Sequence, residues 1–180
     1  MSDTEIHVKG LAALQKALDE LPAKLEVNIM RAAMAAGARV ISKQAKQICP
    51  IEPTGTANDY KRGLGWTPGA LQKSIRVSSR LKGNQVIATV KAGNKQAYYA
   101  HMVEFGTAAH WIKPKNKKAL VFGGVVREKI YHPGSRKNPF MRIAMDAEAQ
   151  RALEAVGERI RTRLAKEGIN VPDTATGDTS

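Results

Sequence analysis

The chain has 180 residues and a formal net charge of +13, and hydrophobic residues make up 43% of it. That hydrophobic content excludes a disordered chain. The single cysteine, Cys49, excludes an internal disulfide and a cysteine zinc site. The longest uncharged run of small or apolar residues, 32–38, is far shorter than the ~20 residues of a membrane span. The polar start at residues 1–5 predicts no secretory signal, so we expect maturation in a reducing cytoplasm.

The positive charge is confined to the middle of the chain. Residues 31–140 carry 20 basic and 4 acidic side chains, whereas residues 1–30 carry 3 and 5 and residues 141–180 carry 6 and 7. This block of +16 indicates a polyanionic partner or an acidic protein surface. A basic surface that serves only solubility is the alternative.

Two helices are predicted in the first third of the chain. Leucines at 11, 14, 18 and 21 predict a short amphipathic helix between Gly10 and Pro22. A longer helix over 23–48 follows, and the small residues of 31–38 predict that another element packs closely against it. Pro50 and Pro53 end this helix, and residues 50–69 are expected to form an irregular loop.

A β-hairpin and a short helix are predicted next. Ile75, Val77, Ser79 and Leu81 alternate with polar residues, which is typical of a half-buried strand, and residues 82–84 form a turn into a return strand that ends at Gly93. Residues 97–105 are expected to form a short helix. Gly106 would end that helix in the left-handed conformation.

Residues 107–137 predict a basic, β-like arm. Strand candidates lie at 111–112, 119–122 and between 125 and 131, around the glycines at 123 and 124. An excursion of this kind can reach a neighbouring molecule. Its basic side chains are Lys113, Lys115, Lys117, Lys118, Arg127, Lys129, Arg136 and Lys137.

The last predicted element is a long helix that ends at Gly168. Asn138 is expected to be its N-cap and Pro139 its first residue. Its apolar stripe is Phe140, Ile143, Ala147, Leu153, Val156, Ile160 and Leu164. Together the elements predict a single α+β domain over 1–168, in which a small antiparallel sheet packs with a long N-terminal and a long C-terminal helix. Residues 169–180 form a polar tail.

The reactive residues do not form a recognisable catalytic set. His101 and Glu104 share a helix face, which is half a metal site at best, and we interpret them as a surface or packing pair. Cys49 lacks a histidine partner and is expected to be buried and inert. The four acids of residues 31–140 are far apart in sequence and surrounded by cations, so a two-metal nuclease would require the fold to bring them together, and no phosphate-binding glycine motif is present. We therefore expect no enzyme, no catalytic or metal-binding residues and no cofactor.

Three clusters of residues carry a resemblance to a known family. The first is Pro50, after an Ala-rich helix, followed by the segment 67–75. The second is the segment 99–107, which contains Val-Glu-Phe-Gly-Thr, and the third is the segment 132–142, which contains Asn-Pro-Phe before a helix. In this order they resemble the neck or tail-completion proteins of long-tailed bacteriophages, over about residues 9–165. The insertion 51–66 departs from the usual spacing of the first cluster.

The resemblance implies a virion structural protein that is assembled in the host cytoplasm. Such proteins are expected to form a homo-oligomeric ring, hexameric like the tail, at the head–tail junction. The ring would join the tail tube or tail terminator to the head-closure or connector protein, around the DNA path and away from any membrane. The motif residues implied to form interfaces are Tyr99, Glu104, Phe105, Gly106, Thr107, Asn138, Pro139 and Phe140. The alternative is a non-specific nucleic-acid-binding protein that uses the basic region 31–140, although no helix-turn-helix element is visible.

Overall fold

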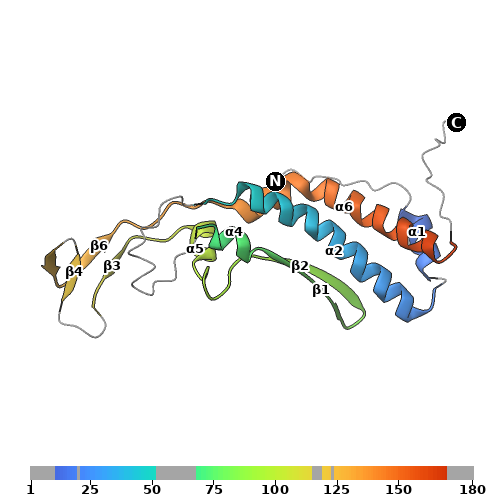
Figure 1. Cartoon of the computed structure of the whole chain (residues 1–180), viewed down its shortest axis with the longest axis horizontal. Coiled ribbons are helices and arrows are strands. Elements are labelled where there is room, and N and C mark those ends of the chain that lie inside the picture. Colours follow the sequence, from blue (N-terminus) through green and yellow to red (C-terminus); the bar gives the residue numbers. More distant parts are fainter. Residues whose placement is uncertain (1–10, 20, 52–67, 115–118, 123, 170–180) are drawn as a thin grey trace.

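The computed structural model describes residues 11–19, 21–51, 68–114, 119–122 and 124–169, and this part of the chain is elongated (Figure 1). Three helices lie at one end, and a thin β-ribbon extends from the other. The polar tail beyond Ile169 and most of the loop 50–69 lie outside the described residues. So do Lys115, Lys117 and Lys118 of the predicted arm.

Two long helices, packed together, form the body. They are α2 (Ala23–Ile48) and α6 (Phe140–Lys166), and α1 (Leu11–Asp19) lies beside the C-terminal half of α6. A Cβ atom at Gly37 would lie 2.7 Å from the backbone oxygen of Ala152 and 2.7 Å from Cγ2 of Val156. The close approach predicted for the small-residue stretch is therefore confirmed, and α6 is the helix that makes it.

The face of α6 that meets the rest of the body differs from the predicted stripe. Phe140, Ile160 and Leu164 are buried as expected, but Ile143, Ala147 and Leu153 are exposed. Ala144, Ala152 and Gly157 are buried instead. At the closest approach of the two helices, beside Gly37, α6 presents the small side chain of Ala152, so Ile143 and Leu153 lie outside the contact.

The predicted hairpin is confirmed as β1 (Arg76–Lys82) and β2 (Gln85–Lys91), which pair antiparallel from Arg76↔Lys91 to Lys82↔Gln85. Both strands pack on α2. Val77 and Ser79 are half-buried as predicted, whereas Leu81, near the turn, is 47% exposed. A one-turn helix, α4 (Ala70–Ser74), leads into β1.

The short helix after the hairpin, α5 (Ala100–Phe105), starts three residues later than predicted. The reason is local, because the side-chain oxygen of Asn94 accepts hydrogen bonds from the backbone N–H groups of Gln96 and Ala97, at 2.9 and 2.8 Å. An asparagine side chain that takes these groups holds the backbone in a turn.

The basic region after α5 is a β-ribbon, as predicted. Strands β3 (His110–Ile112) and β6 (Ile130–His132) pair antiparallel, and β4 (Leu120–Phe122) pairs with β5 (Val125–Arg127). We call residues 107–137 the arm. It leads away from the body, opposite to α1 (Figure 1).

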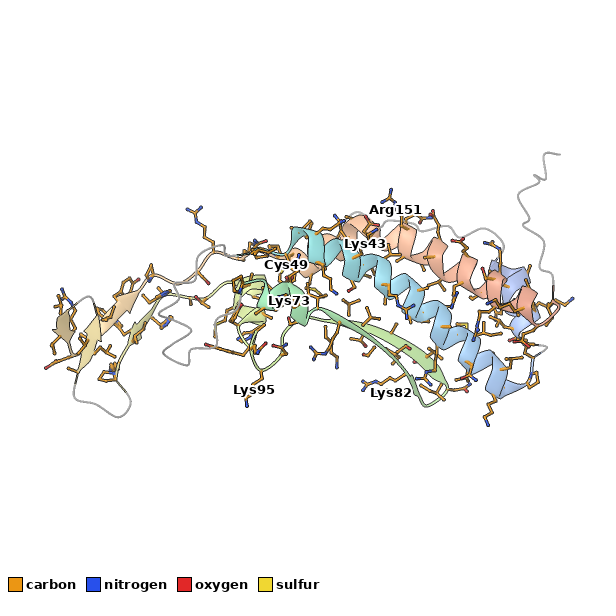
Figure 2. The ribbon with its side chains drawn as sticks, in the orientation of Figure 1. Lys43, Cys49, Lys73, Lys82, Lys95 and Arg151 are labelled. Atoms are coloured by element: carbon orange, nitrogen blue, oxygen red, sulfur yellow. The ribbon has the colours of Figure 1, made fainter. Side chains whose placement is uncertain are left out.

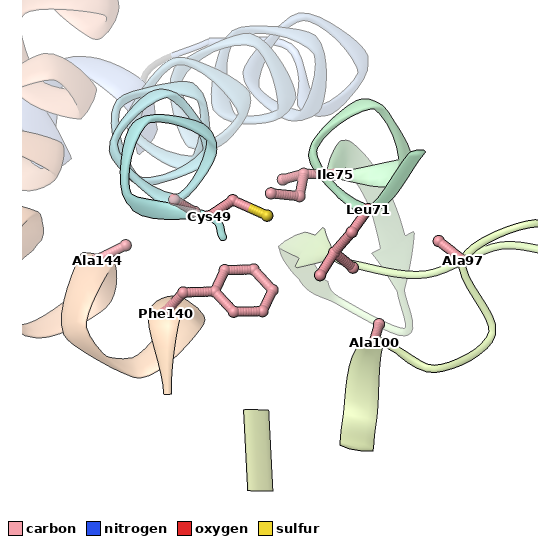
Figure 3. Close-up of a cluster of buried hydrophobic side chains, with 8 residues drawn as sticks. Cys49, Leu71, Ile75, Ala97, Ala100, Phe140 and Ala144 are labelled. Atoms are coloured by element: carbon pink, nitrogen blue, oxygen red, sulfur yellow. The ribbon is translucent and has the colours of Figure 1, made fainter. Parts of the chain in front are cut away.

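Two separate hydrophobic clusters hold the body together. One joins α1 to the N-terminal half of α2 and the C-terminal half of α6, around Ile29 and Leu164. The other joins the end of α2 to α4, α5 and the start of α6, around Phe140, Leu71 and Ile75 (Figure 3). The fold class is therefore α+β as predicted, with two long packed helices and small antiparallel two-stranded sheets.

Candidate functional site

The second and third sequence clusters meet at the base of the arm. Thr107 and Ser135 form an antiparallel bridge, with N–H···O distances of 3.1 and 3.2 Å. Their side-chain oxygens lie 3.1 Å apart. The N–H of Asn138 donates to the carbonyl of Val103 at 2.8 Å. Two motifs about 30 residues apart in sequence therefore form one backbone-bonded junction, which we call the arm base (residues 103–108 and 133–142).

Glu104 ties this junction to α6. Its carboxylate accepts hydrogen bonds from the backbone N–H groups of Met141 at 3.0 Å and Arg142 at 3.1 Å. The first N–H groups of a helix lack partners within the helix and carry partial positive charge, so a carboxylate there is stabilising. Glu104 thus caps a helix that begins 36 residues after it.

The prediction that Asn138 is the N-cap of α6 is wrong, because Glu104 caps this helix instead. Pro139 occupies the N-cap position, no side chain of the cap residue itself bonds the helix, and Asn138 contributes its backbone carbonyl to the N–H of Phe140 at 2.8 Å. Since Glu104 already takes the free N–H groups, α6 has no need of a local cap. No local pattern reveals a cap that comes from another helix.

Gly106 and Gly134 allow the two chains of the arm base to approach each other. Gly106 has φ 73° and ψ −180°, a conformation that only glycine adopts readily. This positive φ was predicted, but the extended ψ is not that of a left-handed helix cap. A Cβ there would lie 2.7 Å from the Ser135 carbonyl oxygen, and one at Gly134 would overlap the carbonyl oxygen of Thr107. The arm therefore leaves the body in a fixed direction.

The aromatic residues of the two motifs have different surroundings. Phe140 is buried in the cluster of Figure 3, and Tyr99 packs against its edge. Phe105, which the resemblance implies to be an interface residue, is 78% exposed. Met102 of the same helix is exposed as well, and so is Tyr98 in the turn before it. This face of α5 is open to a partner.

The arm combines basic and apolar surface. Trp111 and Tyr131 pair across the strands with ring centroids 5.2 Å apart, and the Lys129 ammonium lies 4.8 Å from the Trp111 ring. Both aromatic residues are 55% exposed, and Val121 and Val126 near the tip are 75% and 65% exposed. The described arm cations are all exposed, and they are Lys113, Arg127, Lys129, Arg136 and Lys137.

An apolar groove of about 450 Å³ lies between β2, α2 and α6, and it reaches the arm base only at Met141. Sequence reasoning missed it, because the groove is made by three elements and α6 shows a different face from the predicted one. Met145 and Leu153 on its α6 wall are 52% and 37% exposed. Its lining is Met34, Gly37, Ala38, Ile41, Ala88, Thr89, Val90, Met141, Met145, Ala149, Ala152, Leu153 and Val156.

The reactive side chains have structural surroundings. Cys49 is 4% exposed beside Phe140, and burial raises the pKa of its thiol from 9.0 to about 11, which confirms a buried, inert cysteine. Both oxygens of Glu104 face α6, whereas Nδ1 of His101 lies 3.1 Å from the Tyr98 carbonyl. Within the described ranges, no group of three His, Cys, Asp or Glu residues could hold a metal ion.

A braced arm and an open groove are typical of a structural component that contacts other macromolecules. Comparison with known families gives the particular family. Residues 12–106, slightly more than half of the chain, match the HK97-gp10-like family, described as "Bacteriophage HK97-gp10, putative tail-component". The chain therefore belongs to this family of phage tail components, which is not a family of enzymes, and membership implies a place in the virion tail.

The family match covers α1, α2, the hairpin and α5, and it ends at Gly106. The arm and α6 follow it in the chain. No curated protein and no solved structure matches this sequence. Among the described residues, no helix has the length and apolar character to cross a membrane.

Proposed function

We propose that this tail component forms a ring at the head–tail junction, between the tail tube or tail terminator and the head-closure or connector protein. Six copies would match the symmetry of the tail, and DNA would pass through the centre. The observation that carries the proposal is the arm, which is braced at its base by Glu104, Gly106 and Gly134 and exposes apolar side chains along its length. Exposed apolar surface of this kind is typical of a site where another macromolecule binds.

The charge of the arm supports contact with protein rather than with DNA. A channel wall that gripped many phosphates would gain affinity with each contact, and six-fold repetition would multiply that grip. DNA has to slide through a head–tail junction during ejection, so such a wall would oppose its passage. We infer that most of the arm cations face acidic surfaces of adjacent proteins.

Phage production without this protein tests the proposal. If the gene is inactivated, we expect full heads and finished tails to accumulate separately. Supplying the protein from a plasmid should restore joining. Joined, infectious particles in its absence would contradict a role at the junction.

The second candidate is non-specific binding to nucleic acid. Lys129 over Trp111, within a region of +16, resembles the pairing of cations and aromatic rings that holds single strands. A nucleic-acid binder should shift naked DNA at physiological salt, with an affinity that falls steeply as salt increases. A junction component should show little shift under those conditions.

A further inference from the structure

Each copy has two apolar surfaces that the described part of the chain leaves uncovered. One is the groove between β2, α2 and α6, where Met145 and Leu153 are partly exposed. The other is the arm, where Trp111, Val126 and Tyr131 are more than half exposed. A two-stranded ribbon is at best marginally stable by itself in water, so the arm needs a surface to lie on.

The arm of a given copy does not lie in the groove of that copy. Figure 1 shows the arm on one side of α5 and the two long helices on the other. The junction at its base is held by the Thr107–Ser135 bridge and by the Glu104 cap. At Gly106 and Gly134 the two chains lie so close together that an added Cβ would meet the backbone of the opposite chain. An arm held in this way presents its apolar side chains to another molecule.

We propose that the groove of one copy binds the arm of a second copy of this chain. The number of surfaces agrees, because every copy offers one arm and one groove. The charges agree as well. Residues 107–137 carry eight basic and one acidic side chain, whereas residues 146–158 of α6 carry four acidic and one basic. Burial of apolar side chains in the groove, with attraction between these segments, gives an oriented contact.

The contact joins two different surfaces and is therefore heterologous. Such contacts generate a closed ring where the rotation between copies closes, and a filament where it does not. The inference deepens the proposed ring by naming its subunit interface. It can be tested on the isolated protein, so its failure is separate from a failure of the location in the phage.

The first test changes one wall of the groove. Met145→Glu places a charge in the groove, whereas Ile143→Glu places the same charge on the same helix outside it. The two side chains are 52% and 50% exposed, so neither change should unfold α6. By sedimentation velocity, we expect wild type and Ile143→Glu to associate weakly as concentration rises. Met145→Glu should associate at least about tenfold more weakly.

The second test uses an arm variant, Val126→Asp, which also should not associate with itself. The Val126→Asp variant keeps an intact groove, and the Met145→Glu variant keeps an intact arm. A mixture of the two variants therefore has one intact surface of each kind. We expect the mixture to form a 1:1 complex that grows no further. Only a heterologous contact between arm and groove produces this result.

Several outcomes would overturn the proposal. They are a wild type that stays monomeric at every concentration, equal effects of Met145→Glu and Ile143→Glu, and a mixture that forms no complex. Residues 1–10 of the same chain are the other candidate for the groove. In that case the protein would stay monomeric, and Met145→Glu would lower the Tm as much as deletion of those residues does.

Discussion

Glu104 connects the two motifs, because its carboxylate lies in α5 and its hydrogen bonds end in α6. Glu104→Ala leaves two helix N–H groups without that partner. We expect it to lower the free energy of unfolding by about 1 kcal/mol, the usual value of a helix cap. Urea denaturation measures the difference.

The matched control for Glu104 is Glu158→Ala, which removes an exposed carboxylate in the middle of α6. It should change the stability by less than about 0.5 kcal/mol. Equal losses of stability in the two variants would show that Glu104 contributes through its negative charge alone and not as a helix cap.

The backbone conformation of Gly106 can be tested by substitution. Gly106→Ala should lower the free energy of unfolding by about 1–3 kcal/mol, because alanine does not readily adopt this backbone conformation. In addition, its Cβ would displace the Ser135 carbonyl and the Lys137 N–H, 2.7 and 2.9 Å away. Gly83→Ala is the control, because Gly83 also has a positive φ but has no atom within 4 Å of the added Cβ. Thermal unfolding should show the larger loss for Gly106→Ala. A Gly106 variant that keeps its Tm but no longer joins heads to tails would make this segment a contact surface instead.

The buried thiol of Cys49 should make the free energy of unfolding depend on pH. Its pKa is about 11 in the folded protein against 9.0 for an ordinary thiol, because burial disfavours the thiolate. Between these values the unfolded chain has lost the proton and the folded chain keeps it, so the free energy of unfolding falls as the pH rises from about 9 to about 11. In urea titrations, Cys49→Ala should lack this part of the decrease. Identical pH profiles for the two proteins would show that the thiol does not contribute.

The α2–α6 contact can be tested with two glycines that differ in their surroundings. Gly37→Ala pushes against the Ala152 backbone and the Val156 side chain and should destabilise by about 1–3 kcal/mol. At Gly157, in α6, the nearest atom to an added Cβ is the end of the flexible Arg161 side chain, at 3.8 Å. Gly157→Ala should therefore stabilise by up to about 1 kcal/mol through its helix propensity. The two chemical-denaturation curves should shift in opposite directions, and shifts in the same direction would contradict this account of the contact.

Local signals in the sequence predicted most of the elements. Prolines and leucine spacing define the ends of α2 and the existence of α1, and the alternation from Ile75 onwards predicts β1. These features depend on residues that are neighbours in the chain, which is why sequence periodicity reveals them.

Sequence periodicity could not predict the contacts between segments that lie far apart in the chain. The cap of α6 comes from Glu104, the buried face of α6 is chosen by the approach to Gly37, and the groove needs three elements at once. Phe105 is apolar and yet exposed, and periodicity cannot distinguish a core residue from one that awaits a partner. The sequence singled out the residues of the arm base as motifs, but their mutual contacts are visible only in three dimensions.

For the whole molecule, the arm cations should act on assembly. Changing Lys113, Lys115, Lys117 and Lys118 to glutamate should slow head–tail joining, most clearly at low salt, because charges at an interface rim mainly affect the rate of association. An in-vitro joining assay with purified heads and tails, at several salt concentrations, measures the effect.

The control carries the same change in charge outside the arm, at Lys43, Lys73, Lys82 and Lys95 (Figure 2), and should join at nearly the normal rate. Equal slowing by both sets would indicate an effect of net charge alone. Normal joining with altered DNA retention in the arm variant would place the arm in the DNA channel.

The most direct measurement is the position of this protein in the assembled phage. Electron cryomicroscopy of purified virions should show a ring of its density where the tail meets the head, with each arm against a neighbouring copy. Density distributed along the tail tube, or at the far tip of the tail, would contradict the proposed position while leaving the protein a tail component.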